Sequence, residues 1–248
     1  MTKGSVFFIV RCKPANRFVA FKLDLMKSIW ELLDKKESYQ KIKIGKAASK
    51  LFNNKGYLQT SMKDIATEAK VSKGGIFHYF ATKDEILHFI LNNYLEFALE
   101  NLEQELKEMT DTPLKIKFII SRHLDFYLKN LYEGKTLFQD AHLLPPKHFK
   151  VIAAKERKYY RILAGVLSDF FNGRIQKSKL ALASFALIGM CNWIFSWYNT
   201  KGSITPEELP ELIYDIFYRG INGCQQIWGN RGRGKRGKKF DAYQQLIE

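Results

Sequence analysis

The sequence predicts an all-α fold in which a small three-helix domain precedes a larger helical domain. Apolar residues recur at helical spacing in one segment after another along the 248 residues. No pair of alternating segments joined by a tight turn indicates a β-hairpin, and no internal repeat is present. Because 46% of the residues are hydrophobic, the chain can bury a sizeable core.

The first domain is predicted at residues 39–84. Helices are expected at 39–54, 62–69 and 73–80, because apolar residues fall on one face of each segment. Gly56 supplies the left-handed residue that commonly ends a helix. Two short helices joined by a tight turn behind a supporting helix are typical of a helix-turn-helix, whose second helix fits the major groove of DNA.

Hydroxyl residues stand where these helices should begin. Thr60 or Ser61 can cap the second helix, and Asp64 makes this segment nearly a capping box. Ser72 is placed to cap the third helix, and Thr82 to cap a long fourth one. The capping residues therefore favour the same helix boundaries as the apolar spacing.

The charge of this domain is strongly positive. Residues 39–83 contain nine lysines against Asp64 and Glu68. The whole chain carries a formal charge of +15, which points to a polyanionic partner, either nucleic acid or an anionic membrane surface. A solvated basic face would explain the charge alone, whereas helix order, caps and glycines together favour DNA.

The same stretch resembles the DNA-binding domain of TetR-type transcriptional regulators. The runs AASKLF, KGY, QTSMKDIATEAK, VSKGGIFHYF and ATKDEIL follow one another at that family's spacing over about 45 residues. The resemblance implies that the third helix lies in the major groove and that the starts of the flanking helices contact phosphates. Gly75 and His78 stand where members differ, so they bear on which operator is bound.

The resemblance implies a set of DNA-binding residues, carried over position by position. It predicts that Thr60 and Ser61 offer hydroxyl and N–H donors to phosphate, and that Tyr79 and Lys83 contact the backbone. The set is Thr60, Ser61, Ser72, Lys73, Gly74, Gly75, His78, Tyr79 and Lys83. Ile76, Phe77 and Phe80 are expected in the core, and a solvated surface histidine is the alternative for His78.

The larger domain is predicted to be wholly helical. Its helices are expected at 83–109, 114–131, 135–144, 147–171, 180–199 and 206–227, separated by Gly134, Pro145-Pro146, Asn172-Gly173 and the loop at 200–205. Residues 180–199 are apolar nearly all round, which predicts burial on every side. A membrane span is the rejected alternative for this segment, because it contains Ser184, Asn192 and Ser196 and stands alone.

The last two predicted helices resemble those of a TetR subgroup. The run IGMCNWIFSWYNTKGSITPEELPELIYDIFYRGI spans Ile188 to Ile221 and contains that subgroup's Gly-Met-x-Asn-Trp pattern. Several such members respond to acyl-CoA thioesters and control lipid degradation. The resemblance therefore implies a fatty acyl-CoA effector, with an unrelated hydrophobic compound as the main competitor.

Two further groups of residues follow from this reading. Pocket candidates are Phe97, Phe118, Arg122, Tyr127, Phe138, Met190 and Trp193. The apolar and aromatic ones are residues of a kind more often found in a core than in contact with a ligand, and a surface charge is the alternative for Arg122. Small residues on the penultimate helix would let a twin helix approach closely and form an isologous four-helix interface. Candidates for that homodimer interface are Ala183, Ala186, Gly189, Ile213 and Phe217.

The chain is expected to divide into an extension at 1–38, a DNA-binding domain at 39–84, a ligand-binding and dimerisation domain at 85–228, and a basic tail at 229–248. The extension is either a real arm or a start upstream of the true one at Met26. The tail should be disordered, because glycines and cations bury no core. Its likeness to a phosphate-binding loop fails at Arg236, where Ser or Thr is needed.

No catalytic or metal-binding motif is present, so no enzyme and no cofactor are expected. The three cysteines are far apart, which favours reduced thiols in a cytoplasmic protein without membrane association. The sequence thus predicts a repressor that binds double-stranded operator DNA as a homodimer and is released by a hydrophobic effector. The alternative is a DNA-binding regulator with a filled core and no effector.

Overall fold

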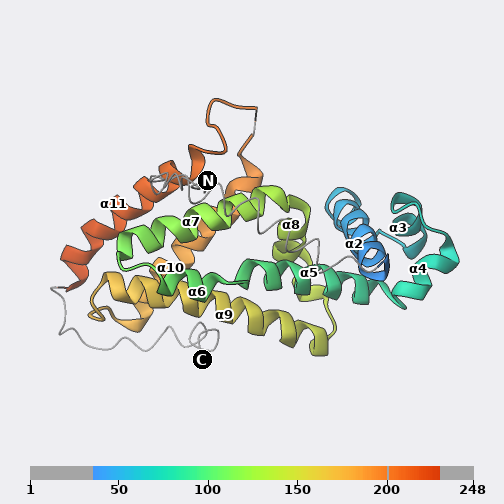
Figure 1. The fold of residues 1–248 in the computed structure, drawn as a ribbon, viewed down its shortest axis with the longest axis horizontal. Coiled ribbons are helices and arrows are strands. Elements are labelled where there is room, and N and C mark those ends of the chain that lie inside the picture. Colours follow the sequence, from blue (N-terminus) through green and yellow to red (C-terminus); the bar gives the residue numbers. More distant parts are fainter. Residues whose placement is uncertain (1–35, 200, 230–248) are drawn as a thin grey trace, which may run out of the picture. The chain divides into compact units, whose positions relative to one another are not determined.

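The computed structural model describes residues 36–199 and 201–229, so the expectations for the N-terminal extension up to residue 35 and for the basic tail lie outside the described residues. The described part consists of helices, turns and loops without a strand, which confirms the all-α prediction (Figure 1). Residues from Ile44 onward form one compact unit, and the packing below is that of this unit.

The N-terminal helices are α2 (Lys36–Lys55), α3 (Met62–Glu68), α4 (Lys73–Tyr79) and the start of α5 (Lys83–Leu99). Their boundaries agree with the sequence prediction to within a few residues. Apolar residues at helical spacing on all four helices meet in one core, in which Ile44, Ile65, Ile76 and Ile86 are fully buried. Gly56 directly follows the end of α2 and has φ +93°, a conformation that favours glycine.

The remaining helices are α6 (Leu102–Lys107), α7 (Thr112–Lys129), α8 (Leu131–Asp140), α9 (Pro146–Phe170), α10 (Lys177–Asn192) and α11 (Leu209–Gly229), with short 3₁₀ turns η1 (Ala141–Leu143) and η2 (Trp193–Ser196). Helix α7 packs against α9, α10 and α11. The faces they share form a second core that includes Phe118, Leu124, Leu163 and Leu187.

The prediction of one helix over residues 83–109 is wrong. The chain leaves the helix after Leu99, and Asn101 adopts a left-handed conformation with φ 55° before α6 begins. Asparagine tolerates this conformation better than most residues. Arg122 of α7 occupies the break, where its guanidinium donates a hydrogen bond to the carbonyl oxygen of Glu100.

Gly134 was predicted to separate two helices, and this is also wrong. Gly134 lies inside α8, and the boundary falls at Asn130, which is the C-cap of α7. A Cβ atom on Gly134 would lie 2.6 Å from Cε2 of Tyr127, so the glycine admits the tyrosine ring rather than ending a helix.

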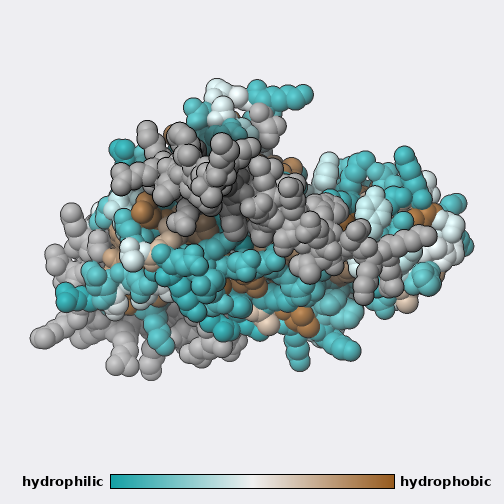
Figure 2. All heavy atoms as spheres, viewed as in Figure 1, coloured by the Kyte–Doolittle hydropathy of each residue, from teal (hydrophilic) through white to brown (hydrophobic). Residues whose placement is uncertain are grey.

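Burial of residues 180–199 on every side is contradicted. The α-helix ends at Asn192, and the side chains of Leu182 and Trp193 are 60% and 56% exposed in the single chain. Among the described residues, the segment Lys177–Ser196 is long and apolar enough to cross a membrane by length and composition alone, with 28% of its most apolar window buried. A helix that packs against a second subunit would have the same composition. Figure 2 shows hydrophilic side chains over most of the described surface on the visible face.

Candidate nucleic-acid interface and effector domain

The turn into α3 is held by a capping box. The Ser61 hydroxyl accepts a hydrogen bond from the backbone N–H of Asp64 at 3.1 Å, and the Asp64 carboxylate accepts from the N–H of Ser61 at 2.9 Å. Lys55 of α2 donates to the same carboxylate at 2.8 Å. The bonds from Lys55 and Ser61 hold the pKa of Asp64 well below its ordinary value. Helix α3 therefore starts at a fixed position relative to the end of α2.

The first turn of α4 presents its backbone to the outside. The Ser72 hydroxyl caps the helix by accepting from the N–H of Gly75 at 2.9 Å. Lys73 and Gly74 are exposed, and a Cβ atom on Gly74 would meet nothing within 4 Å. The protein leaves room for a Cβ atom at this position, so packing inside the chain does not require a glycine there.

Phe77 is not a core residue as expected. Ile76 and Phe80 are buried, but the Phe77 side chain is 48% exposed. Phe77 lies four residues after Lys73, so the two share one side of α4. In the sequence, the spacing of four residues from the polar Lys73 was the feature that could have predicted the exposure of Phe77. His78 is also exposed, whereas Tyr79 is partly buried and its ring meets His78 edge to face at 5.0 Å.

Thr60 does not offer the phosphate donors that were expected of it. Its side chain is 2% exposed, and its hydroxyl donates to the carbonyl oxygen of Gly56 at 2.7 Å. Its backbone N–H donates to the carbonyl oxygen of Tyr57 at 3.2 Å. Both donors are therefore used inside the turn, and the predicted role is wrong. Ser61 is exposed at the same helix end, but its N–H and hydroxyl bond to Asp64.

Lys83 is likewise not a freely available phosphate contact. Its ammonium donates to the carbonyl oxygens of Tyr57 at 2.7 Å, Thr60 at 2.9 Å and Leu58 at 3.4 Å. It also lies over the Tyr57 ring, 4.3 Å from the centroid. Burial lowers the pKa of Lys83. An ammonium group has three N–H donors, and the loop between α2 and α3 takes all of them. We call this arrangement the lysine clasp; it joins α5 to that loop.

The pocket candidates do not come together as one set. Phe118 and Tyr127 are buried, and Phe97 and Met190 are partly buried. Arg122 forms an ion pair with Glu105 at 2.8 Å. The remaining two, Phe138 and Trp193, are 58% and 56% exposed, so their assignment to an internal pocket is wrong.

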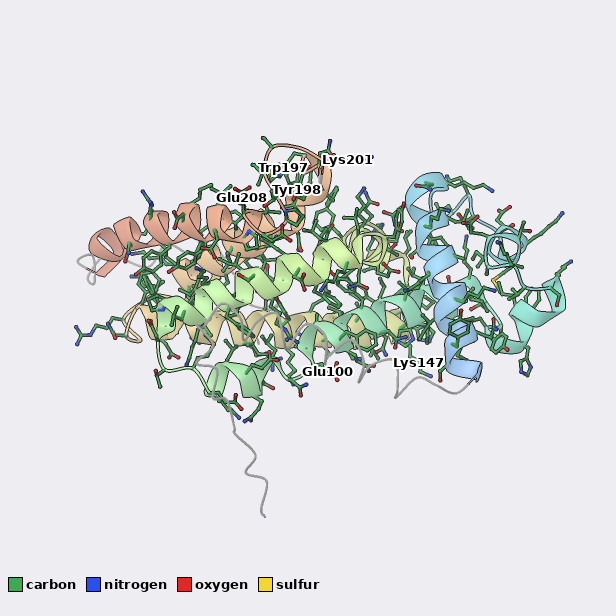
Figure 3. All side chains as sticks on the ribbon, turned by 45° about the horizontal axis from the view of Figure 1, so that its top comes forward. Glu100, Lys147, Trp197, Tyr198, Lys201 and Glu208 are labelled. Carbon is green, nitrogen blue, oxygen red and sulfur yellow. The ribbon has the colours of Figure 1, made fainter. Side chains whose placement is uncertain are left out.

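These two aromatic residues belong to a surface group instead. Both rings approach Phe195, with centroids at 6.0 Å from Phe138 and 5.4 Å from Trp193. Trp197, Tyr198 and Lys201 lie a few residues beyond, at the start of the loop that leads to α11 (Figure 3).

The dimer candidates are also divided by burial. Ala186 and Gly189 are exposed on α10, as an interface requires. Ala183, Ile213 and Phe217 face the core of their own subunit, so their assignment to the interface is wrong. Among the described side chains of α10 and α11, the large apolar residues that are exposed are instead Leu182, Leu212 and Ile216. On α11 the residues 213 and 217 and the residues 212 and 216 have the same spacing, so periodicity alone did not show which pair faces outward.

The geometry defines a helix-turn-helix protein with a larger helical domain, and comparison with known proteins gives the family. Residues 44–90 match the family described as bacterial regulatory proteins, tetR family. Residues 111–221 match the tetracyclin repressor-like C-terminal domain. Together these matches cover more than half of the chain, which belongs to the TetR family of transcriptional regulators. These families consist of DNA-binding regulators and not of enzymes.

Three similar proteins illustrate the relationship. A 64-residue segment is 42% identical to the HTH-type transcriptional regulator HbdR of Aromatoleum sp. (strain CIB) and covers 26% of this chain, but only 28% of HbdR. A TetR-family regulator from Bordetella parapertussis 12822 has a TM-score of 0.68 at 25% identity over 71% of this chain and 93% of that one. AibR, solved with isovaleryl coenzyme A and operator DNA, has a TM-score of 0.64 at 21% identity over 71% and 97%, which is a likeness of fold alone.

Proposed function

We propose that the protein is a repressor that binds operator DNA through α4 and leaves it when a hydrophobic effector, such as a fatty acyl-CoA, binds the C-terminal domain. The observation that carries the DNA-binding mode is the exposed side of α4, where Lys73, Gly74, Phe77 and His78 lie on a firmly capped helix-turn-helix. The N-terminal part of such a helix is what reaches base edges in the major groove.

The proposed subunit arrangement is a homodimer built on α10 and α11. Leu182, Leu212 and Ile216 are 60%, 45% and 63% exposed, which is unusual for residues of this size. Cβ atoms added to Gly189 and Gly220 would meet nothing within 4 Å, so a partner helix could approach closely. Two such subunits would offer recognition helices to half-sites one helical turn of DNA apart. The proposed location is the cytoplasm, where the DNA is.

The effector proposal has two supports. The C-terminal sequence from Ile188 to Ile221 resembles regulators that respond to acyl-CoA thioesters, and AibR, a protein of the same fold, was solved with isovaleryl coenzyme A. The competing proposal is a regulator with a filled core and no effector, because Phe118 and Tyr127 are already packed in the C-terminal core.

The test is binding to a labelled DNA fragment from upstream of the protein's own gene, at moderate salt, with and without palmitoyl-CoA. Sequence-specific binding that palmitoyl-CoA abolishes is the expected result. Specific binding that no acyl-CoA changes would favour the regulator without this effector. Equal binding to unrelated DNA would contradict the proposed operator recognition.

A further inference from the structure

A chain of polar side chains crosses the core of the C-terminal domain. We call His123 and Tyr127 of α7, Tyr159 of α9 and Asn192 of α10 the polar cluster. The imidazole of His123 bonds on both sides, with Nδ1 2.9 Å from the Tyr159 hydroxyl and Nε2 2.9 Å from Oδ1 of Asn192. The rings of His123 and Tyr127 lie nearly parallel, with centroids 6.3 Å apart. Side chains of three helices thus meet at one place.

The hydrogen bonds of the cluster have a definite direction. Burial lowers the pKa of His123, so the imidazole is neutral near pH 7. Since Oδ1 of Asn192 can only accept, the proton of His123 lies on Nε2. Nδ1 is then an acceptor, and the Tyr159 hydroxyl donates to it. Both ring nitrogens are therefore satisfied without a charge.

Tyr127 is the exception in this cluster. Its side chain is 2% exposed, and its hydroxyl has no hydrogen-bond partner among the described residues. A buried hydroxyl without a partner destabilises a protein, and phenylalanine would fill the same ring volume without that cost. Gly134 leaves room for the ring, since a Cβ atom there would lie 2.6 Å from Cε2 of Tyr127. The chain therefore accommodates a hydroxyl that bonds to none of the residues that the structure describes.

The charges around the cluster favour a neutral ligand group. The neighbouring cation, Arg122, is paired with Glu105 at 2.8 Å and donates to the carbonyl oxygen of Glu100. Its charge is therefore balanced already. A carboxylate placed beside Tyr127 would bring a new charge into an apolar core without a matching cation, whereas a carbonyl oxygen would need only a donor.

We propose that the Tyr127 hydroxyl donates a hydrogen bond to a neutral carbonyl oxygen of the effector, such as that of a thioester, and that the His123–Tyr159–Asn192 chain holds the helices around it. This inference rests on the proposed function and adds the chemical class of the group that is bound. The surrounding core residues, which include Phe118, Leu124 and Leu187, suit the apolar chain attached to such a carbonyl.

The experiment compares the full-length protein with Tyr127→Phe, which removes only the hydroxyl. Tyr160→Phe is the matched control, because Tyr160 is next to Tyr159 on α9 but packs its ring on Phe185, 4.4 Å away. The probes are palmitoyl-CoA, isovaleryl-CoA and free palmitate, which carries a carboxylate in place of the thioester. Calorimetry gives the affinities, thermal unfolding gives the stability without ligand, and DNA binding is measured in the same samples.

The expected result is that a thioester binds better than palmitate and that Tyr127→Phe weakens this binding by about three- to tenfold. The melting temperature of the free variant should be unchanged or higher, and its DNA affinity should equal that of the wild type. Tyr160→Phe should leave thioester affinity unchanged.

Four results would overturn the inference. Three of them are a thioester affinity that Tyr127→Phe leaves unchanged, a melting temperature that this variant lowers by several degrees, and stronger binding of palmitate than of both thioesters. Binding of none of the three probes also overturns the class of ligand named here. The DNA measurement remains a separate test of the regulator, so the two failures are distinguishable.

Discussion

The amide nitrogen of Asn53 lies 2.9 Å from the hydroxyl oxygen of Thr136, and this bond joins α2 of the DNA-binding domain to α8 of the C-terminal domain. The same amide donates to the carbonyl oxygen of Tyr132 at 2.9 Å. One turn earlier on α2, the Ser49 hydroxyl donates to the carboxylate of Glu133 at 3.2 Å. Helix α8 also carries Gly134, against which Tyr127 packs. A short route of contacts therefore connects the core of the C-terminal domain with α2.

The first prediction concerns this connection. Asn53→Ala should keep the affinities for operator and for acyl-CoA within about threefold but reduce the release of DNA by acyl-CoA, because coupling between two sites is a separate free energy of typically about 1–3 kcal/mol. Fluorescence anisotropy with labelled operator measures both quantities. The control is Asn54→Ala, at an exposed neighbouring position. Full release from the Asn53 variant would show that the coupling runs elsewhere.

The second prediction separates the lysine clasp from a phosphate contact. Lys73 is exposed at the start of α4, where its ammonium can neutralise a phosphate beside the groove. If it does, Lys73→Met should weaken DNA binding and reduce the slope of log affinity against log salt by about 0.9. Lys83→Met should leave that slope unchanged and lower the melting temperature, since it frees the carbonyl oxygens of Tyr57, Leu58 and Thr60. The same loss of slope for both variants would restore Lys83 as a phosphate contact.

The third prediction assigns a role to the exposed ring of Phe77. Phenylalanine on a recognition helix can contact the methyl group of thymine. In an operator obtained by selection with the wild type, replacement of the contacted thymine by uracil should weaken binding roughly fivefold, the value of one buried methyl group of about 1 kcal/mol. Phe77→Ala should bind both operators equally. A uracil effect that persists in this variant would assign the methyl contact to another residue.

The fourth prediction is a pH dependence at the start of α3. The pKa of Asp64 is lowered in the folded protein, so its carboxylate stabilises the fold above about pH 4, the ordinary aspartate range, and this contribution is lost as the pH falls further. Asp64→Asn should therefore lower the melting temperature at pH 7 and have a smaller effect near pH 2.5. Glu68→Gln is the control on the same helix, and its effect should be small at both pH values. An equal effect of Asp64→Asn at both would contradict the assignment.

The fifth prediction tests the proposed dimer. Ile216→Glu places a charge on an exposed apolar side chain of α11, so it should convert a dimer into a monomer and leave the helix content unchanged. Sedimentation measures the mass, and circular dichroism measures the helix content. Asp215→Glu is the matched control on the adjacent position. A monomeric wild type, or a variant that stays dimeric, would place the interface elsewhere.

Local signals predicted the fold well and the side-chain partners poorly. The helix caps at Ser61, Ser72 and Thr82 could be predicted from the sequence, because a capping side chain bonds to a backbone N–H only two or three residues away. The role of Lys83 could not be predicted, because its hydrogen-bond partners lie in the loop about 25 residues earlier. No local sequence pattern shows that this loop folds against the start of α5. Thr60 has the right residue type for a phosphate contact, but burial decides its role.

The C-terminal domain shows the same limit. Gly134 was predicted to end a helix. Glycine is instead required there because the ring of Tyr127, on α7, packs against this position. On α11, two overlapping apolar series have the same period, and only the packing of α7 against one of them shows which side remains exposed. The exposure of Phe77 could have been predicted from its spacing of four residues from Lys73. An aromatic residue next to Ile76 was instead expected to lie in the core.

The break at Asn101 fixes the length of α5, which ends at Leu99. Its 17 residues span about 25 Å, so a tilt of about 5° around Leu99 would displace Lys83 by about 2 Å. Such a displacement exceeds the tolerance of a hydrogen bond, so the loop from Tyr57 to Thr60 must either follow Lys83 or lose its bonds. A longer helix that continued through residue 109 would have to carry α6 with it. Because the helix is interrupted, a tilt of α5 would not oblige α6 to move with it.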